Sequence, residues 1–352
     1  MTPDCHVTPR RTAVGSDMKA GRATRHRPAP RRFGAHVSIA GGLFNAFAEA
    51  KRLGCDCMQV FVKNQRQWTA PPLTEEAVRL WREAAQSTAV QPVVAHDTYL
   101  INLASPEDDL WKRSLAAFLD ELTRCERLEI PYLVTHPGSH TGYGVSGGLR
   151  RVARALNEAH RRTRGFRVRV LLETTAGQGT SLGCRFEHLA AILARVSAPE
   201  RVGVCFDTCH VFAAGYDLAS AEGYAATMDA LDRAVGLSLV RCFHVNDSQR
   251  ERGSHVDRHA HIGRGAIGLD AFRRLLGDRR FADVPMLLET PKDRDARGRE
   301  WDRVNLAILR RIQRQAGAGA AEAGDPAGCR VSGASIESGD AARPAVPRRT
   351  QR

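Results

Sequence analysis

Residues 204–217 read VCFDTCHVFAAGYD, and this stretch decides the fold. It begins as a short apolar run rich in strand-forming residues, and Asp207 and His210 follow in a predicted loop that contains glycine. An aspartate and a histidine displayed together where a buried strand ends are poor core residues and good ligands for a metal such as Zn²⁺. A hydrogen-bonded aspartate beside a surface histidine would give the same sequence, so the interpretation depends on how the other strands end.

Similar apolar runs recur along the chain and alternate with longer segments of helical spacing, such as 110–128 and 148–162. The runs are continuous more often than strictly alternating, which is typical of parallel strands covered on both faces. Eight such units predict an α/β fold, a single TIM (β/α)8 barrel, with a doubly wound open sheet as the alternative. The runs cover 33–39, 55–62, 92–97, 131–137, 167–174, 201–208, 239–247 and 284–290.

The two ends of the chain lack this repeat. Residues 1–32 hold eight Arg or Lys against two acids, and residues 316–352 are rich in Ala, Gly, Ser and Pro. Both compositions are typical of disordered segments. We therefore expect one barrel domain at 33–315, between a disordered basic extension at 1–32 and a disordered tail at 316–352.

Composition excludes several classes of protein. No apolar run approaches the roughly 18 residues that a membrane span requires, so no membrane partner is expected. The nine cysteines lack the paired CxxC spacing of zinc knuckles and are typical of reduced thiols in a cytoplasmic protein. The net charge of +13 suits a polyanionic partner, although basic domains without one are common.

Six consecutive predicted strands, from the third to the eighth, end in a His, Asp or Glu. In a parallel barrel all strand C-termini lie on the face that carries active sites, so these side chains converge. Burying several carboxylates there without a cation would be unfavourable. Imidazoles and carboxylates suit Zn²⁺, with Mn²⁺ or Fe as alternatives, and their number implies more than one ion. The strand ends supply His96, His136, Glu173, Asp207, His244 and Glu289, and the loops add His210, Asp257 and His259.

Longer motifs surround these residues. They read GAHVSIAGG (34–42), KNQRQW (63–68), AHDTYLINLA (95–104), HPGSH (136–140), LLETTAGQG (171–179), FDTCHVFAAGYD (206–217), FHVNDS (243–248), DRHAHIG (257–263) and LLETP (287–291). In this order they resemble the successive signatures of bacterial endonuclease IV, across essentially all of 33–315. The chain departs from that family at Thr174, where Asn is usual, and at Arg264, where an acidic residue or Lys is expected.

The resemblance implies an apurinic/apyrimidinic endonuclease of base excision repair, of the deoxyribonuclease IV class. Such an enzyme uses a metal-activated hydroxide to hydrolyse the phosphodiester on the 5′ side of an abasic site in double-stranded DNA. The products are a 3′-hydroxyl and a 5′-deoxyribose phosphate, and 3′-end trimming is expected too. We expect a monomer in the bacterial cytoplasm, associated with the nucleoid through DNA.

The resemblance also implies three Zn²⁺ ions, with Mn²⁺ as an alternative at one site. The first set of ligands is His96, His136 and Glu173. Glu173 bridges to the second set, which Asp207, His244 and Glu289 complete, and the third set is His210, Asp257 and His259.

Two further groups of residues are implied by the family. Glu173 and Glu289 are the expected catalytic residues. Arg66, Tyr99 and Leu100 occupy positions similar to the side chains that penetrate DNA, where an abasic nucleotide rotates out of the duplex at little cost.

Two other functions remain open from the sequence. A metal-dependent sugar isomerase or epimerase on the same barrel would need one or two metals and a closed pocket, but neither Arg66 nor Tyr99. A non-catalytic DNA-binding or scaffold protein would be expected to have lost ligands, and all nine positions are occupied.

Overall fold

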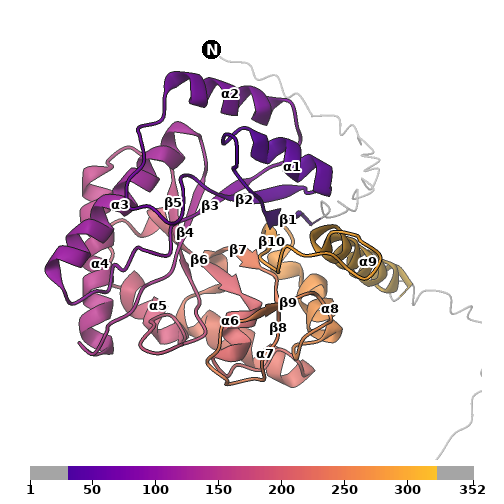
Figure 1. Ribbon diagram of the computed structural model, residues 1–352. Helices are drawn as coiled ribbons and strands as arrows, with labels where there is room; N and C mark the ends of the chain where they lie inside the picture. The colour runs from indigo at the N-terminus through magenta and orange to yellow at the C-terminus, as the bar shows by residue number, and fades with distance from the viewer. Residues whose placement is uncertain (1–30, 323–352) are drawn as a thin grey trace, which may run out of the picture.

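Eight parallel strands close into a barrel in the computed structural model, which describes residues 31–322 (Figure 1). Each strand pairs with its neighbours in the chain, and β10 closes the circle against β1. Every strand of the barrel lies inside one of the eight predicted runs, so the TIM barrel is confirmed and the open sheet is excluded. The barrel strands are β1 (Phe33–His36), β2 (Cys57–Phe61), β3 (Val93–His96), β4 (Tyr132–Thr135), β5 (Arg169–Glu173), β6 (Val202–Asp207), β7 (Val240–His244) and β10 (Met286–Leu288).

Helices cover the outside of the barrel (Figure 1). In α4, for example, Leu149, Val152 and Leu156 recur at helical spacing and are buried, while Arg150 and Arg154 are exposed. No helix of the described chain is long and apolar enough to cross a membrane. The helices are α1 (Asn45–Leu53), α2 (Glu75–Gln86), α3 (Asp108–Arg127), α4 (Val145–Arg162), α5 (Phe186–Leu193), α6 (Thr208–Ala213), α7 (Ala221–Ala234), α8 (Leu269–Gly277) and α9 (Trp301–Glu322), with short 3-10 turns η1 (Pro199–Arg201), η2 (Leu237–Leu239) and η3 (Arg279–Phe281).

The described part of the chain extends slightly past the predicted barrel domain at both ends. Arg31 is buried, and its guanidinium donates to the carbonyl oxygens of Leu276 (3.0 Å) and Phe281 (2.5 Å). Helix α9 continues past residue 315 to Glu322. The rest of the predicted extension and tail, 1–30 and 323–352, lies outside the described residues, and the domain boundaries remain predictions.

The side chains inside the barrel form two layers. Residues two apart on a strand point to the same side, so each strand contributes one inward-facing residue to each layer. The lower layer is apolar and fully buried. The upper layer, two residues further along each strand, lies at the C-terminal end of the barrel and is polar. The lower layer consists of Cys57, Val94, Val134, Leu171, Cys205, Cys242 and Leu287, and the upper layer of Gln59, His96, His136, Glu173, Asp207, His244 and Glu289.

Strand β1 contributes the eighth member of each layer, Gly34 and His36. A Cβ at Gly34 would lie 1.9 Å from the carbonyl oxygen of Cys57, so only glycine fits at this position. Beyond β7 the chain adds an antiparallel hairpin of β8 (Asp247–Ser248) and β9 (His259–Ala260). This hairpin carries His259 back to the upper layer.

Candidate metal centre

The structure brings all nine predicted metal ligands together at the C-terminal end of the barrel. Four of them are the last residues of their strands, two directly follow a strand, and three come from the segments after β6 and β7. They form three groups, and within each group one nitrogen or carboxylate oxygen from every residue lies within 4.8 Å of the others. The groups are His96, His136 and Glu173; Glu173, Asp207, His244 and Glu289; and His210, Asp257 and His259.

Glu173 lies at the middle of the cluster and is fully buried. Its Oε2 lies 3.0 Å from Nε2 of His96 and 3.1 Å from Nε2 of His136. Its Oε1 lies 2.9 Å from Nδ1 of His244 and 3.2 Å from Nδ1 of His210. Burial alone would raise the pKa of this carboxyl, but the charges of His244 and His136 outweigh it and hold the pKa well below its ordinary value. One carboxylate anion therefore joins two of the three groups.

Hydrogen bonds behind the imidazole rings determine which nitrogen faces the cluster. Nδ1 of His96 lies 2.7 Å from the carbonyl oxygen of Asp97, and Nδ1 of His210 lies 2.8 Å from that of Thr174. Nδ1 of His259 lies 3.1 Å from the carbonyl oxygen of Glu289. Since a carbonyl oxygen only accepts, Nδ1 of each ring carries a proton, and in a neutral ring Nε2 keeps a lone pair.

The Nε2 atoms that face the cluster lie close to one another and to carboxylate oxygens, an arrangement that favours a bound cation. Nε2 of His210 and Nε2 of His259 are 3.4 Å apart, and the carboxylate oxygens of Asp257 lie 3.1 Å and 3.2 Å from them. Two lone pairs and a carboxylate repel one another unless a positive charge lies among them. Nitrogen and carboxylate oxygen without thiolate form a donor set that fits Zn²⁺, and also Mn²⁺ or Fe.

Protons can supply the same charge, and the pKa values of the rings reflect this. Burial lowers the pKa of His259, but the charge of Asp207 and the hydrogen bond with Asp257 outweigh it and raise the pKa to about 9. For His96 the hydrogen bond and charge of Glu173 likewise outweigh burial and raise the pKa to about 9. The site therefore attracts cations strongly.

Asp207 connects the cluster to helix α6. Its Oδ1 accepts a hydrogen bond of 2.8 Å from the backbone N–H of His210 and so caps the helix. Its Oδ2 faces Nδ1 of His244 at 3.8 Å and Nε2 of His259 at 3.7 Å. Thr174, at the position where Asn is usual, keeps a supporting contact, because its hydroxyl accepts from the backbone N–H of Asp207 at 2.9 Å.

Two polar residues outside the predicted set, Gln59 and Asn246, form hydrogen bonds that orient the candidate ligands. The side-chain oxygen of Gln59 accepts from Nε2 of His244 at 2.8 Å, and its Nε2 donates to Glu289. This leaves Nδ1 of His244 to face the cluster. Asn246 donates to Oδ2 of Asp207 at 2.7 Å and accepts from the backbone N–H of Glu289 at 2.8 Å. Gln59 becomes identifiable once the register of the barrel is known, whereas Asn246 stands inside the motif FHVNDS (243–248), which assigns it no role.

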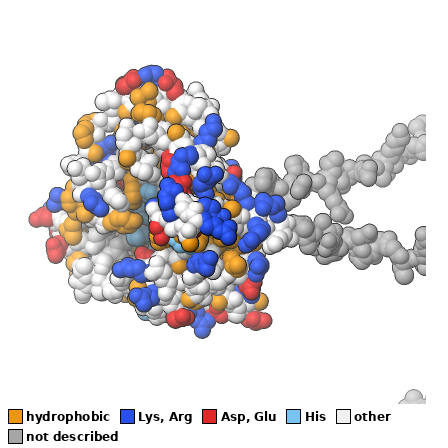
Figure 2. Space-filling model, turned by 45° about the vertical axis from the view of Figure 1, so that its right-hand side comes forward, with side chains coloured by type: hydrophobic (Ala, Val, Ile, Leu, Met, Phe, Trp, Pro, Cys, Tyr) orange, Lys and Arg blue, Asp and Glu red, His pale blue; other side chains and the backbone are white. Residues whose placement is uncertain are grey.

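The predicted DNA-contacting residues, here called the rim residues, lie in the loops that follow β2 and β3, at the end of the barrel that carries the cluster. Tyr99 is 69% exposed, although its ring centroid lies only 6.1 Å from that of His96. Arg66 is exposed in the loop after β2, and Leu100 is partly buried. Figure 2 shows histidine side chains at the floor of a hollow, with Lys and Arg gathered on one side of it. The loops after β7 and β10 carry the exposed basic residues Arg250, Arg252, Arg258, Arg264, Lys292, Arg294, Arg297 and Arg299.

Comparisons with known proteins agree with this geometry. Residues 47–312 match the family described as xylose isomerase-like TIM barrel. A probable endonuclease 4 of Chloroflexus aurantiacus is 56% identical over 281 residues, covering 80% of this chain and 98% of that protein. The crystal structure of endonuclease IV from Thermus thermophilus gives a TM-score of 0.71 at 38% identity, over 81% of this chain and 99% of that one.

A more distant structure, of a D-tagatose 3-epimerase-like protein, gives a TM-score of 0.64 at 19% identity, over 82% of this chain and 99% of that one. At this identity the similarity shows a shared fold alone. The match to the barrel family and the 56% identity to a probable endonuclease 4 cover most of the chain. The chain therefore belongs to the endonuclease IV family of xylose isomerase-like TIM barrels.

Proposed function

We propose that this protein is a zinc-dependent apurinic/apyrimidinic endonuclease that hydrolyses the phosphodiester 5′ to an abasic site in double-stranded DNA. The observation that carries the proposal is the cluster of nine imidazole and carboxylate residues around one buried carboxylate, Glu173. Membership of the endonuclease IV family supports base excision repair as its setting. The products are a 3′-hydroxyl and a 5′-deoxyribose phosphate, and trimming of 3′ ends follows from the same chemistry.

Under this proposal each of the three groups holds one Zn²⁺, and Mn²⁺ can replace it at one of them. When bound, the ions supply positive charge for the phosphate and lower the pKa of a coordinated water. Glu173 joins the first two groups through its two oxygens. Gln59 and Asn246 orient His244 and Asp207, so that the lone pairs of the ligands are aimed before an ion arrives.

Exposure indicates from which side the phosphate approaches. The side chains of Glu173 and Asp207 are fully buried, whereas those of Glu289 and His136 are 16% and 33% exposed. The carboxylate of Asp257 is 41% exposed. The scissile phosphate would therefore approach over His136, Glu289 and Asp257 and be held by the metal ions that these residues bind, while Glu173 lies beneath as the shared ligand.

The rim residues are assigned to recognition of the abasic site. Tyr99 presents a large exposed aromatic ring, which can pack into the gap left by a missing base. Arg66 and Leu100 lie in the loops on the same face. The exposed basic residues after β7 and β10 supply contacts to DNA phosphates. We infer that the protein works as a monomer in the cytoplasm, near the nucleoid.

A duplex oligonucleotide with one tetrahydrofuran abasic analogue tests the activity. Because this analogue cannot undergo β-elimination, incision on its 5′ side with a 3′-hydroxyl product requires hydrolysis. Incision of natural abasic DNA but not of the analogue would replace the hydrolytic mechanism with a lyase one. Epimerisation of a ketose without any DNA incision would favour the sugar epimerase instead.

Metal analysis tests the cofactor independently of activity. We expect three equivalents of zinc in the purified, folded protein, retained through a brief exposure to EDTA. Fewer than two equivalents in protein that incises the analogue would contradict a trinuclear centre.

A further inference from the structure

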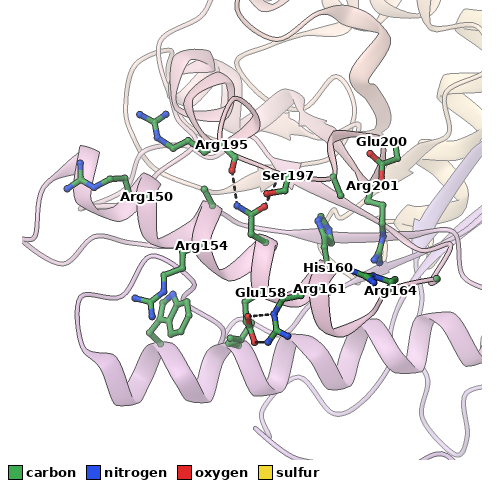
Figure 3. Close-up of a pocket in the computed structure, with 16 residues that line it drawn as sticks. Arg150, Arg154, Glu158, His160, Arg161, Arg164, Arg195, Ser197, Glu200 and Arg201 are labelled. Carbon is green, nitrogen blue, oxygen red and sulfur yellow. Dashed lines mark hydrogen bonds and ion pairs between the residues drawn. The ribbon is translucent and has the colours of Figure 1, made fainter.

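We propose a second ligand site, for a small phosphate-bearing anion, on the outer side of the barrel between α4 and the segment that joins α5 to β6. A cavity of about 1020 Å³ opens here, and none of the residues that line it belongs to the metal cluster. Figure 3 shows Arg150 and Arg154 toward one end of the cavity and His160, Arg164 and Arg201 toward the other. This inference does not depend on the proposed function.

The walls of the cavity have a large excess of positive charge. Six arginines line it, namely Arg150, Arg154, Arg161, Arg164, Arg195 and Arg201, against two acids. One of those acids, Glu158, is already paired with Arg161 at 2.7 Å. Within the described residues none of the other five arginines has an ion-pair partner.

The inner wall carries polar atoms without hydrogen-bond partners. His160 is only 7% exposed, and neither of its ring nitrogens has a partner among the described residues. Nε of Arg201 is unsatisfied as well, although its terminal nitrogens are held by the carbonyl oxygens of Thr163 (2.9 Å) and Val168 (3.2 Å). Burial and the charge of Arg201 lower the pKa of His160 to about 4, against a small opposing effect of Glu200. The ring is therefore neutral at pH 7 and offers an N–H donor.

These donors define the chemistry of the ligand. Guanidinium groups and an imidazole N–H outnumber the one carboxylate of the lining that is unpaired among the described residues, that of Glu200, and so favour an anion that has several acceptor oxygens. The planar guanidinium fork matches two oxygens of a phosphate group. A concave surface lined by charge of one sign also concentrates counter-ions. Trp111 also lines the cavity, and the guanidinium of Arg154 lies 4.9 Å from the centroid of its ring.

Inorganic phosphate is the probe for the test, with the zinc-loaded full chain as the protein. The readout is the side-chain NMR signal of His160, assigned by its loss in His160→Gln. We expect phosphate to shift this signal and to raise the pKa of His160, because a bound anion favours the protonated ring. In Arg154→Ala the phosphate concentration needed should rise about tenfold or more, since a charge-assisted hydrogen bond is lost.

The matched control is Arg162→Ala, which removes the same charge from an exposed position of the same helix that does not line the cavity. This variant should respond to phosphate like the parent, and both variants should incise DNA normally. A His160 signal that ignores phosphate, or an equal response in Arg154→Ala and the parent, would overturn the proposal. So would a shift caused by undamaged duplex DNA but not by phosphate, because the cavity would then contact the DNA backbone.

Discussion

The two layers of the barrel interior lie two residues apart on every strand, yet they have opposite properties. On β5 the lower residue is Leu171 and the upper one is Glu173, and both are fully buried. The lower layer stabilises the fold by removing aliphatic groups and thiols from water. The upper layer opposes folding unless cations or protons neutralise its carboxylates and lone pairs. On each strand, the residue that stabilises the fold and the residue that faces the candidate site are therefore only two positions apart.

Glu173→Gln should have the largest effect. The substitution keeps the shape but removes the anion that faces four imidazoles, so the first two groups lose their shared ligand. We expect incision of the tetrahydrofuran duplex to fall on the order of a thousandfold and bound zinc to decrease. Circular dichroism should show a folded barrel. Normal zinc content together with normal incision would show that Glu173 is not the shared ligand of the first two groups.

Leu171→Ala tests the lower layer on the same strand. We expect the free energy of unfolding to fall by about 2–5 kcal/mol, from lost burial and the cavity left behind, as measured by urea denaturation. At a temperature where the variant is folded, incision per folded molecule and zinc content should match the parent. A selective loss of incision in folded protein would show that the layers are not independent.

Gln59→Leu should have a smaller effect on the upper layer. It removes the acceptor that fixes the ring of His244 and the donor to Glu289. Loss of such a contact behind a metal ligand typically lowers metal affinity by about 10–100-fold, which competition with a chelator would measure. Gln86→Leu, at an exposed position at the end of α2, is the control and should leave metal affinity unchanged.

Thr174→Asn should have the smallest effect. Asn can also accept from the backbone N–H of Asp207, the bond that the Thr174 hydroxyl now receives at 2.9 Å. We expect incision to change by less than about threefold, the scale of a small difference in one hydrogen bond. A much larger loss would mean that the hydroxyl contacts the reacting groups.

The strands, and the residues that cluster at their C-terminal ends, could be predicted from sequence because both depend on local patterns. Parallel strands buried on both faces read as continuous apolar runs, and each ligand stands at the end of a run or inside a long motif. Gln59 was missed because an amide within β2 has no special pattern until the register of the barrel is known. The hairpin of β8 and β9 was missed because its strands have two residues each.

The remaining differences depend on tertiary structure or on residues that favour more than one state. The Ala- and Gly-rich stretch that begins at residue 316 predicts disorder, but alanine is also the best helix former, and α9 extends into the first residues of this stretch, to Glu322. The arginine-lined cavity depends on how α4 packs beside the chain that leaves α5. Neither segment predicts it alone, because Arg150, Arg154 and Arg195 look like ordinary solvent-exposed residues in the sequence.

Asp207 uses one oxygen to cap α6 and the other to face His244 and His259. The start of this helix and the occupancy of the metal centre are therefore thermodynamically linked, and the linkage is reciprocal. An ion that draws the carboxylate toward the cluster changes how firmly it holds the first turn of the helix, and fraying of that turn weakens the ion's binding by the same factor. Amide hydrogen exchange at His210 should therefore report metal occupancy.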